Sequence, residues 1–156
     1  MATLVDTNIL LRSIQPTDPL FGITLSALQI LGCLTDRLAV VPQNMVEFWA
    51  VATRPRANNG LGLAPSEASV EIQKILSTFQ FFPETPTIFD EWMKLVTAYA
   101  VSGKDTHDAR ILAAMKVHGI ERILTFDEAD FARYKGAITV LTPTSVVASQ
   151  EVKSGF

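Results

Sequence analysis

Residues 2–11, ATLVDTNILL, contain a change of secondary structure with a carboxylate at the junction. The apolar start of this stretch predicts a short strand that ends on Asp6. An apolar run then begins a helix, whose free first-turn amides Thr7 or Asn8 can cap. A strand that ends in this way places Asp6 on the carboxyl edge of a sheet, where α/β proteins bind ligands. The alternative is that Asp6 only helps to start the helix.

The composition bounds the class of protein. The 156 residues are 48% hydrophobic and 19% charged, which predicts a single domain over 1–156, with a core to about residue 145 and a C-terminal tail over 146–156. The net charge of −3 argues against a basic surface over the whole domain, although a local basic rim remains compatible with it. The single cysteine, Cys33, cannot form an internal disulfide. With no signal peptide and no apolar run of the ~18 residues that a membrane span needs, we expect a cytoplasmic protein without membrane segments.

Strand and helix patterns alternate along the chain. Short strands are predicted at 38–41, 80–82, 122–126 and 138–141. Helices are predicted from the first strand to about 14, and over about 20–35, 42–53, 67–79, 87–102 and 107–118. A loop over 54–65 is rich in Gly, Asn and Pro. This alternation predicts an α/β fold in which helices cover both faces of a mostly parallel sheet.

Three further acids follow strands or lie early in helices. Glu47 is the only charged residue in MVEFWAVA and is predicted to border an apolar strip of a helix. The alternative is that its side chain reaches solvent from the edge of the helix. Asp108 precedes the apolar positions of the helix after Thr106 and is predicted to share their inward face, although an acid in a first turn is also favoured by the helix dipole. Asp127 comes directly after the strand RILTF, as Asp6 does after its own strand.

In a parallel sheet these four positions fall on one edge, so the acids can converge. Two carboxylates ~5 Å apart at an effective dielectric of ~20 repel by roughly 3 kcal/mol, and a cluster is therefore costly as pure structure. A hard divalent cation, Mg²⁺ or Mn²⁺, would relieve that cost. Zinc is not expected, because no cysteine or histidine cluster has metal-ligand spacing.

These residues resemble the motifs of a known family. The stretches LVDTNILL, VEFWAVATRPR, HDARILAAM and ILTFDEADF, in this order, are similar to those of PIN-domain ribonucleases, and most closely to VapC-like toxins of toxin–antitoxin pairs. The resemblance covers nearly the whole chain and implies a three-layer α/β/α fold with a five-stranded parallel sheet. It assigns Asp6, Glu47 and Asp108 to the three core acids, and Asp127 to a more variable fourth acid. Asn8 and Thr125 match supporting polar residues.

The activity implied by the resemblance is metal-dependent hydrolysis of RNA phosphodiester bonds. The acids would hold Mg²⁺ or Mn²⁺, partly through water. Because acids repel the phosphate backbone, basic residues should guide the RNA. The candidates are Arg12, Arg54, Arg56, Lys104 and Arg110, for each of which ordinary solvated surface is the alternative. His107 is either an RNA contact or a capping or packing residue, and Asp105 and Asp130 are expected at a turn or helix start.

The predicted partners and the competing classes follow from the same pattern. The helix from residue 20 is apolar on more than one face, and the resemblance points to a homodimer and a small antitoxin protein.

A haloacid-dehalogenase-type phosphotransferase would need a second Asp two residues after Asp6, where this chain has Asn8. The non-enzymatic alternative is a PIN fold that only binds RNA or protein, but the presence of all four acids argues against it.

Overall fold

The computed structural model describes residues 1–34 and 37–155. Thr35, the approximate end expected for the helix that starts near residue 20, lies outside the described residues, as does Phe156, the end of the expected domain. Among the described helices, none is long and apolar enough to cross a membrane.

Five short parallel strands form a single sheet in the order β3-β2-β1-β4-β5. They are β1 (Ala2–Val5), β2 (Arg37–Val40), β3 (Gln80–Phe81), β4 (Arg122–Leu124) and β5 (Thr139–Leu141). The first strand is central and pairs with β2 on one side and β4 on the other, with Leu4 opposite Ala39 and Ile123. The predicted α/β fold with a five-stranded parallel sheet is confirmed.

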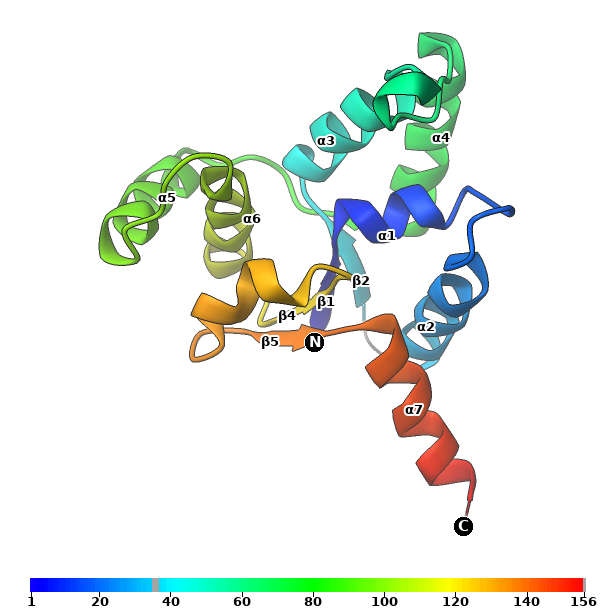
Figure 1. The fold of residues 1–156 in the computed structure, drawn as a ribbon. Coiled ribbons are helices and arrows are strands. Elements are labelled where there is room, and N and C mark those ends of the chain that lie inside the picture. The colour runs from blue at the N-terminus through cyan, green and yellow to red at the C-terminus, as the bar shows by residue number, and fades with distance from the viewer. Residues whose placement is uncertain (35–36, 156) are drawn as a thin grey trace.

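Helices cover both faces of this sheet (Figure 1). They are α1 (Thr7–Arg12), α2 (Phe21–Cys33), α3 (Pro42–Thr53), α4 (Pro65–Thr78), α5 (Pro86–Ala98), α6 (Asp105–Val117) and α7 (Pro143–Ser154), with 3-10 turns η1 (Arg56–Asn58) and η2 (Glu128–Tyr134). Prolines at the first helical position begin α3, α4, α5 and α7, where the missing N–H costs no hydrogen bond.

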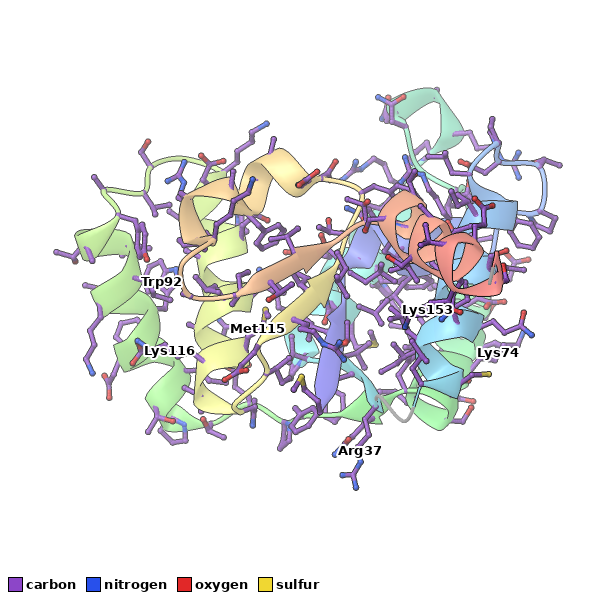
Figure 2. All side chains as sticks on the ribbon, turned by 90° about the horizontal axis from the view of Figure 1, so that it is seen from below. Arg37, Lys74, Trp92, Met115, Lys116 and Lys153 are labelled. Carbon is purple, nitrogen blue, oxygen red and sulfur yellow. The ribbon has the colours of Figure 1, made fainter. Side chains whose placement is uncertain are left out.

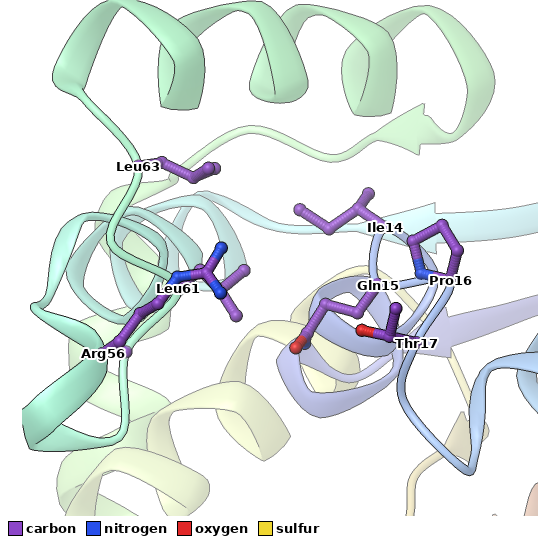
Figure 3. Close-up of a pocket in the computed structure, with 8 residues that line it drawn as sticks. Ile14, Gln15, Pro16, Thr17, Arg56, Leu61 and Leu63 are labelled. Carbon is purple, nitrogen blue, oxygen red and sulfur yellow. The ribbon is translucent and has the colours of Figure 1, made fainter.

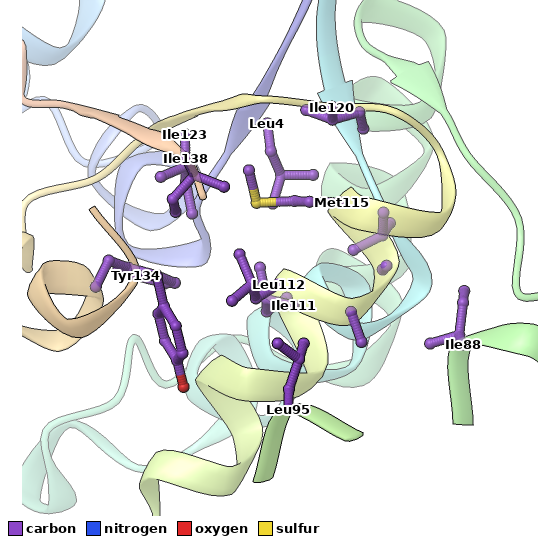
Figure 4. Close-up of a cluster of buried hydrophobic side chains, with 14 of the residues drawn as sticks. Leu4, Ile88, Leu95, Ile111, Leu112, Met115, Ile120, Ile123, Tyr134 and Ile138 are labelled. Carbon is purple, nitrogen blue, oxygen red and sulfur yellow. The ribbon is translucent and has the colours of Figure 1, made fainter. Parts of the chain in front are cut away.

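The strands divide their side chains between two hydrophobic clusters, because successive strand residues point to opposite faces. Leu4 packs with α5, α6 and η2 in one cluster (Figure 4), whereas its neighbour Val5 packs with α1, α2, α3, α4 and α7 in the other. In the view from below, Met115 lies between α6 and the strands, while Lys74 and Lys153 point outward (Figure 2). The strands that carry the acids are thus fixed from both sides.

Several predicted boundaries differ from the observed ones. The helix expected to begin at His107 after a Thr106 cap begins instead at Asp105, and the Thr106 hydroxyl donates to the carbonyl of Gly103 at 2.8 Å. The helix expected to run to about residue 102 ends at Ala98, because Ala100 adopts a left-handed conformation with φ of 49°. Most of residues 146–156, expected as a tail, belong to α7, which packs against α2 and buries Val146.

Candidate active site

The four acids predicted from the sequence line one open cavity of about 390 Å³ at the carboxyl edge of the sheet. Asp6 lies between β1 and α1, and Asp127 follows β4 and precedes η2. Glu47 is in the second turn of α3, and Asp108 is in the first turn of α6. The cavity is also lined by Thr7, Asn8, Leu11, Val51, His107 and Asp130. Elements distant in sequence therefore bring these acids to one place.

Asp6 is the most buried of the acids, with 8% of its surface exposed. It is itself the N-cap of α1, so the expectation that Thr7 or Asn8 caps this helix is wrong, since both lie inside the helix. Its Oδ1 accepts from the backbone N–H of Thr7 at 2.8 Å, and its Oδ2 accepts from the Thr125 hydroxyl at 2.7 Å. Burial raises the pKa of Asp6 to about 6, with smaller contributions from Glu47 and Asp127, against the lowering effect of these hydrogen bonds.

The Asn8 side chain links the two strand-end acids. Its Nδ2 lies 3.3 Å from Asp6 Oδ2, 3.1 Å from Thr125 Oγ1 and 2.9 Å from Asp127 Oδ2. Its Oδ1 accepts from the backbone N–H of Phe126 at 3.2 Å. An amide suits this position because it adds donors without adding another negative charge. An Asp here, as in a dehalogenase-type site, would face Asp6 and Asp127 with no donor.

Glu47 has both carboxylate oxygens held by neutral donors. Its Oε2 accepts from the Thr7 hydroxyl at 3.0 Å, and its Oε1 accepts from Gln43 Nε2 at 2.8 Å. The Asn44 amide in turn lies 3.3 Å from the Thr7 hydroxyl. The alternative in which Glu47 reaches solvent from the helix edge is wrong, because the side chain is half-buried and hydrogen-bonded to Thr7 of α1.

Asp108 is half-buried, and its charged form is disfavoured by its surroundings. Burial, followed by the charges of Asp130, Asp6, Glu47 and Asp105, raises the pKa of Asp108 to about 7. The sequence analysis expected Asp130 only at a turn or helix start, where it does lie, and did not predict that it shares the cavity and is the largest charged contributor to this shift. The sequence signal that could have identified Asp130 as a site residue is its position three residues after Asp127, in the first turn of η2.

The chemistry of these groups fits a hard divalent cation. The donors are carboxylate oxygens of the kind that Mg²⁺ and Mn²⁺ prefer, and burial raises the pKa values of Asp6 and Asp108, so a bound cation would favour the charged forms of these two groups. Over the described part of the chain, no three acidic, histidine or cysteine side chains are placed to hold one ion jointly. Mg²⁺ keeps several of its waters and needs only one or two direct carboxylates, so the remaining acids would reach it through water.

The predicted basic residues lie at different distances from this cavity. The guanidinium of Arg12 lies 4.9 Å from the ring centre of Phe126, and Arg110 bonds to Gln43 and Glu84 at the rim of a neighbouring cavity that shares Glu47 and His107. The side chains of Arg54 and Lys104 are exposed. Arg56 lies over a separate pocket of about 220 Å³ between Ile14 and Leu61 (Figure 3). No residue lines both that pocket and the acidic cavity, so the structure does not bring Arg56 to the acids.

Fold and site together define an α/β protein with an acidic site at the carboxyl edge of a five-stranded parallel sheet. The family model of the PIN domain matches residues 3–137. The chain belongs to the PIN-domain family. No curated protein sequence matches it.

Solved structures with the same fold include toxin–antitoxin proteins. VapBC2 from Rickettsia felis, bound to a DNA fragment from its promoter, has a TM-score of 0.69 at 13% identity over 91% of this chain and 98% of that chain. A toxin–antitoxin complex from Klebsiella pneumoniae has a TM-score of 0.63 at 23% identity, covering 90% and 97%. The Mycobacterium tuberculosis toxin VapC20, described as cleaving the sarcin–ricin loop, has a TM-score of 0.62 at 14% identity, covering 85% and 95%. At these identities the likeness shows the fold.

Proposed function

We propose that this protein is a Mg²⁺- or Mn²⁺-dependent ribonuclease and the toxin of a toxin–antitoxin pair. The observation that carries the proposal is the joint lining of one cavity by Asp6, Glu47, Asp108 and Asp127. Carboxyl groups with raised pKa values are expected where a cation normally compensates their charge. The solved structure of a PIN-fold toxin that cleaves RNA supports the same class of reaction.

The metal would supply an activated water and neutralise charge on the phosphate and the leaving oxygen. Asp6, Glu47 and Asp108 would hold it, partly through water, with Asp127 at the exposed side of the cavity. Thr7, Asn8 and Thr125 fix the carboxylates through the hydrogen bonds described above, so that the acids need little reorganisation when an ion binds. Arg12 and Arg110 would contact the RNA backbone near the cavity, where they offset the repulsion between phosphates and acids.

A homodimer and a small antitoxin protein are part of the proposal. Large apolar side chains are exposed on α3 and α5, namely Val46 at 69%, Trp49 at 38%, Phe89 at 60% and Met93 at 44%. Within each helix the two side chains are three or four residues apart and so adjoin on the helix surface, and adjoining exposed apolar side chains are typical of protein interaction surfaces. Several solved structures with this fold are complexes of a toxin with its antitoxin.

The proposal is tested by incubating the purified protein with cellular RNA and with a random-sequence RNA pool. We expect cleavage with Mg²⁺ or Mn²⁺ and none with excess chelator. Asp6→Asn should lower the cleavage rate at least a hundredfold, because it removes the charge of a buried ligand. The matched control is Asp90→Asn, at an exposed position of α5, which should leave the rate unchanged. Cleavage that survives chelation, or equal rates for Asp6→Asn and the wild type, would contradict the proposal.

A further inference from the structure

The side chain of Gln43 joins three groups around the acidic cavity, although it does not line the cavity itself. It lies in the first turn of α3, with only 9% of its surface exposed. Its Nε2 donates to Glu47 Oε1 at 2.8 Å and to the backbone carbonyl of His107 at 2.7 Å. Its Oε1 accepts from Arg110 Nη1 at 3.2 Å. All the hydrogen-bonding groups of this buried amide are therefore engaged near the site.

The orientation of the Gln43 amide follows from its partners. The carboxylate of Glu47 and the carbonyl of His107 only accept hydrogen bonds, and a guanidinium only donates them. A rotation of the amide by 180° would place its oxygen against two acceptors and its NH₂ group against a donor. The network thus allows one orientation, which is the one observed.

This amide connects the two helices that carry Glu47 and Asp108. Gln43 is one turn before Glu47 on α3, and the carbonyl of His107 belongs to the residue next to Asp108 on α6. The other oxygen of Glu47 is held from α1 by Thr7. Gln43 therefore fixes both the rotation of the Glu47 carboxylate and the distance of α3 from the start of α6.

We propose that Gln43 is a positioning residue that sets the geometry of the metal-binding acids Glu47 and Asp108. This inference rests on the proposed function, because it assigns a role toward the cation that those acids would hold. Residues that orient metal ligands typically change metal affinity 10- to 100-fold when they are replaced. A neutral amide is suited to the role, since a carboxylate at this position would repel Glu47 and lose both donated bonds.

The test is calorimetric titration of Mn²⁺ into metal-free protein. Gln43→Met keeps the length of the side chain and removes all three hydrogen bonds, so we expect its Mn²⁺ dissociation constant to rise at least tenfold with the folded circular dichroism spectrum retained. The matched control is Gln73→Met, at an exposed position of α4, which should bind Mn²⁺ as the wild type does. Equal affinities of Gln43→Met and the wild type would overturn the role of Gln43. A wild-type protein that binds no Mn²⁺ would contradict the metal site itself, and the role of Gln43 with it.

Two further variants keep the test decisive if Gln43→Met does not fold. Gln43→Asn retains an amide that is one methylene too short to reach both helices, and it should also weaken Mn²⁺ binding; wild-type affinity in this variant would overturn the inference. Arg110→Met removes the bond that orients the Gln43 amide, together with the ion pair to Glu84, but leaves both bonds that Gln43 donates, so its loss of affinity should be smaller. The losses of Arg110→Met and Gln43→Asn should be less than additive when the two are combined, because both act through one network. Fully additive losses would contradict the network.

Discussion

At the scale of single residues, the acids of the cavity differ in how much of their charge is compensated. Glu47 receives two neutral hydrogen bonds, and Asp6 receives bonds from Thr7 and Thr125. The pKa of Asp108 is raised chiefly by burial and by Asp130. The sequence identified the four acids through their places after strands or early in helices. Asp130 also lies early in a helical turn, but its approach to Asp108 could not be predicted, because it depends on how η2 packs against α6.

The raised pKa values predict the pH dependence of the metal-free protein. Asp6 and Asp108 have folded-state pKa values of about 6 and about 7, above the usual value of 3.8. Between about pH 4 and 7 these two groups therefore bind more protons in the folded state than in the unfolded state, and their contribution to the free energy of unfolding falls as the pH rises. Asp108→Asn should raise the free energy of unfolding at pH 8, because it removes a charge that the folded state disfavours. The gain should be only on the order of 1 kcal/mol, since solvent screens this half-buried group.

Urea unfolding at pH 5 and pH 8, with a chelator present, measures this effect. The difference in stability between Asp108→Asn and the wild type should be larger at pH 8 than at pH 5. A variant that is less stable than the wild type at pH 8 would show that Asp108 has a compensating partner in the metal-free protein.

At the scale of elements, the sequence predicted whether a segment is a helix or a strand better than it predicted where that segment begins and ends. Short apolar runs located every strand to within two residues, because a parallel sheet that is covered on both faces favours continuous apolar strands. The start of α6 could not be located from Thr106, because its hydroxyl donates to the Gly103 carbonyl and the helix starts two residues earlier than expected. The helix α7 was also missed. Its burial is limited to one turn near Val146, and its hydrophobic pattern is correspondingly weak.

The packing of α2 predicts unequal effects for two of its leucines. Leu31 is 4% exposed in the cluster that contains Val146 of α7, whereas Leu25 is 41% exposed. Leu31→Ala should lower the free energy of unfolding by about 2–5 kcal/mol, the usual cost of a cavity in a core. Leu25→Ala should cost less than about 1 kcal/mol in the isolated protein. Equal losses in urea unfolding would mean that the exposed strip of α2 is covered in solution.

At the scale of the whole molecule, the site depends on elements from most of the chain. The sheet brings Asp6 and Asp127 together through the β1–β4 pair, while α3 and α6 approach from opposite faces with Glu47 and Asp108. The sequence predicted this convergence because parallel strands end on one edge. It could not predict the hydrogen bonds by which Thr7 and Gln43 connect the helices, because these depend on how the helices pack against one another.

The exposed apolar side chains of α3 and of α5 predict self-association. We expect sedimentation at tens of micromolar, on the order of the dissociation constants of many weak interfaces, to give the mass of a dimer. Trp49→Asp should shift the protein toward monomer, because it places a charge among the exposed apolar side chains of α3. A wild-type protein that sediments only as a monomer would contradict the proposed homodimer.

The most direct test of the central claim compares two aspartates that lie three residues apart on α6. Asp108 lines the acidic cavity, whereas Asp105 pairs with Arg133 at 3.1 Å and does not line it. Asp108→Asn should lower Mg²⁺-dependent RNA cleavage at least a hundredfold. Asp105→Asn should retain most of it, because a surface ion pair contributes at most about 1 kcal/mol to stability. With both variants shown to be folded by circular dichroism, full activity of Asp108→Asn would contradict a metal-dependent nuclease site at these acids.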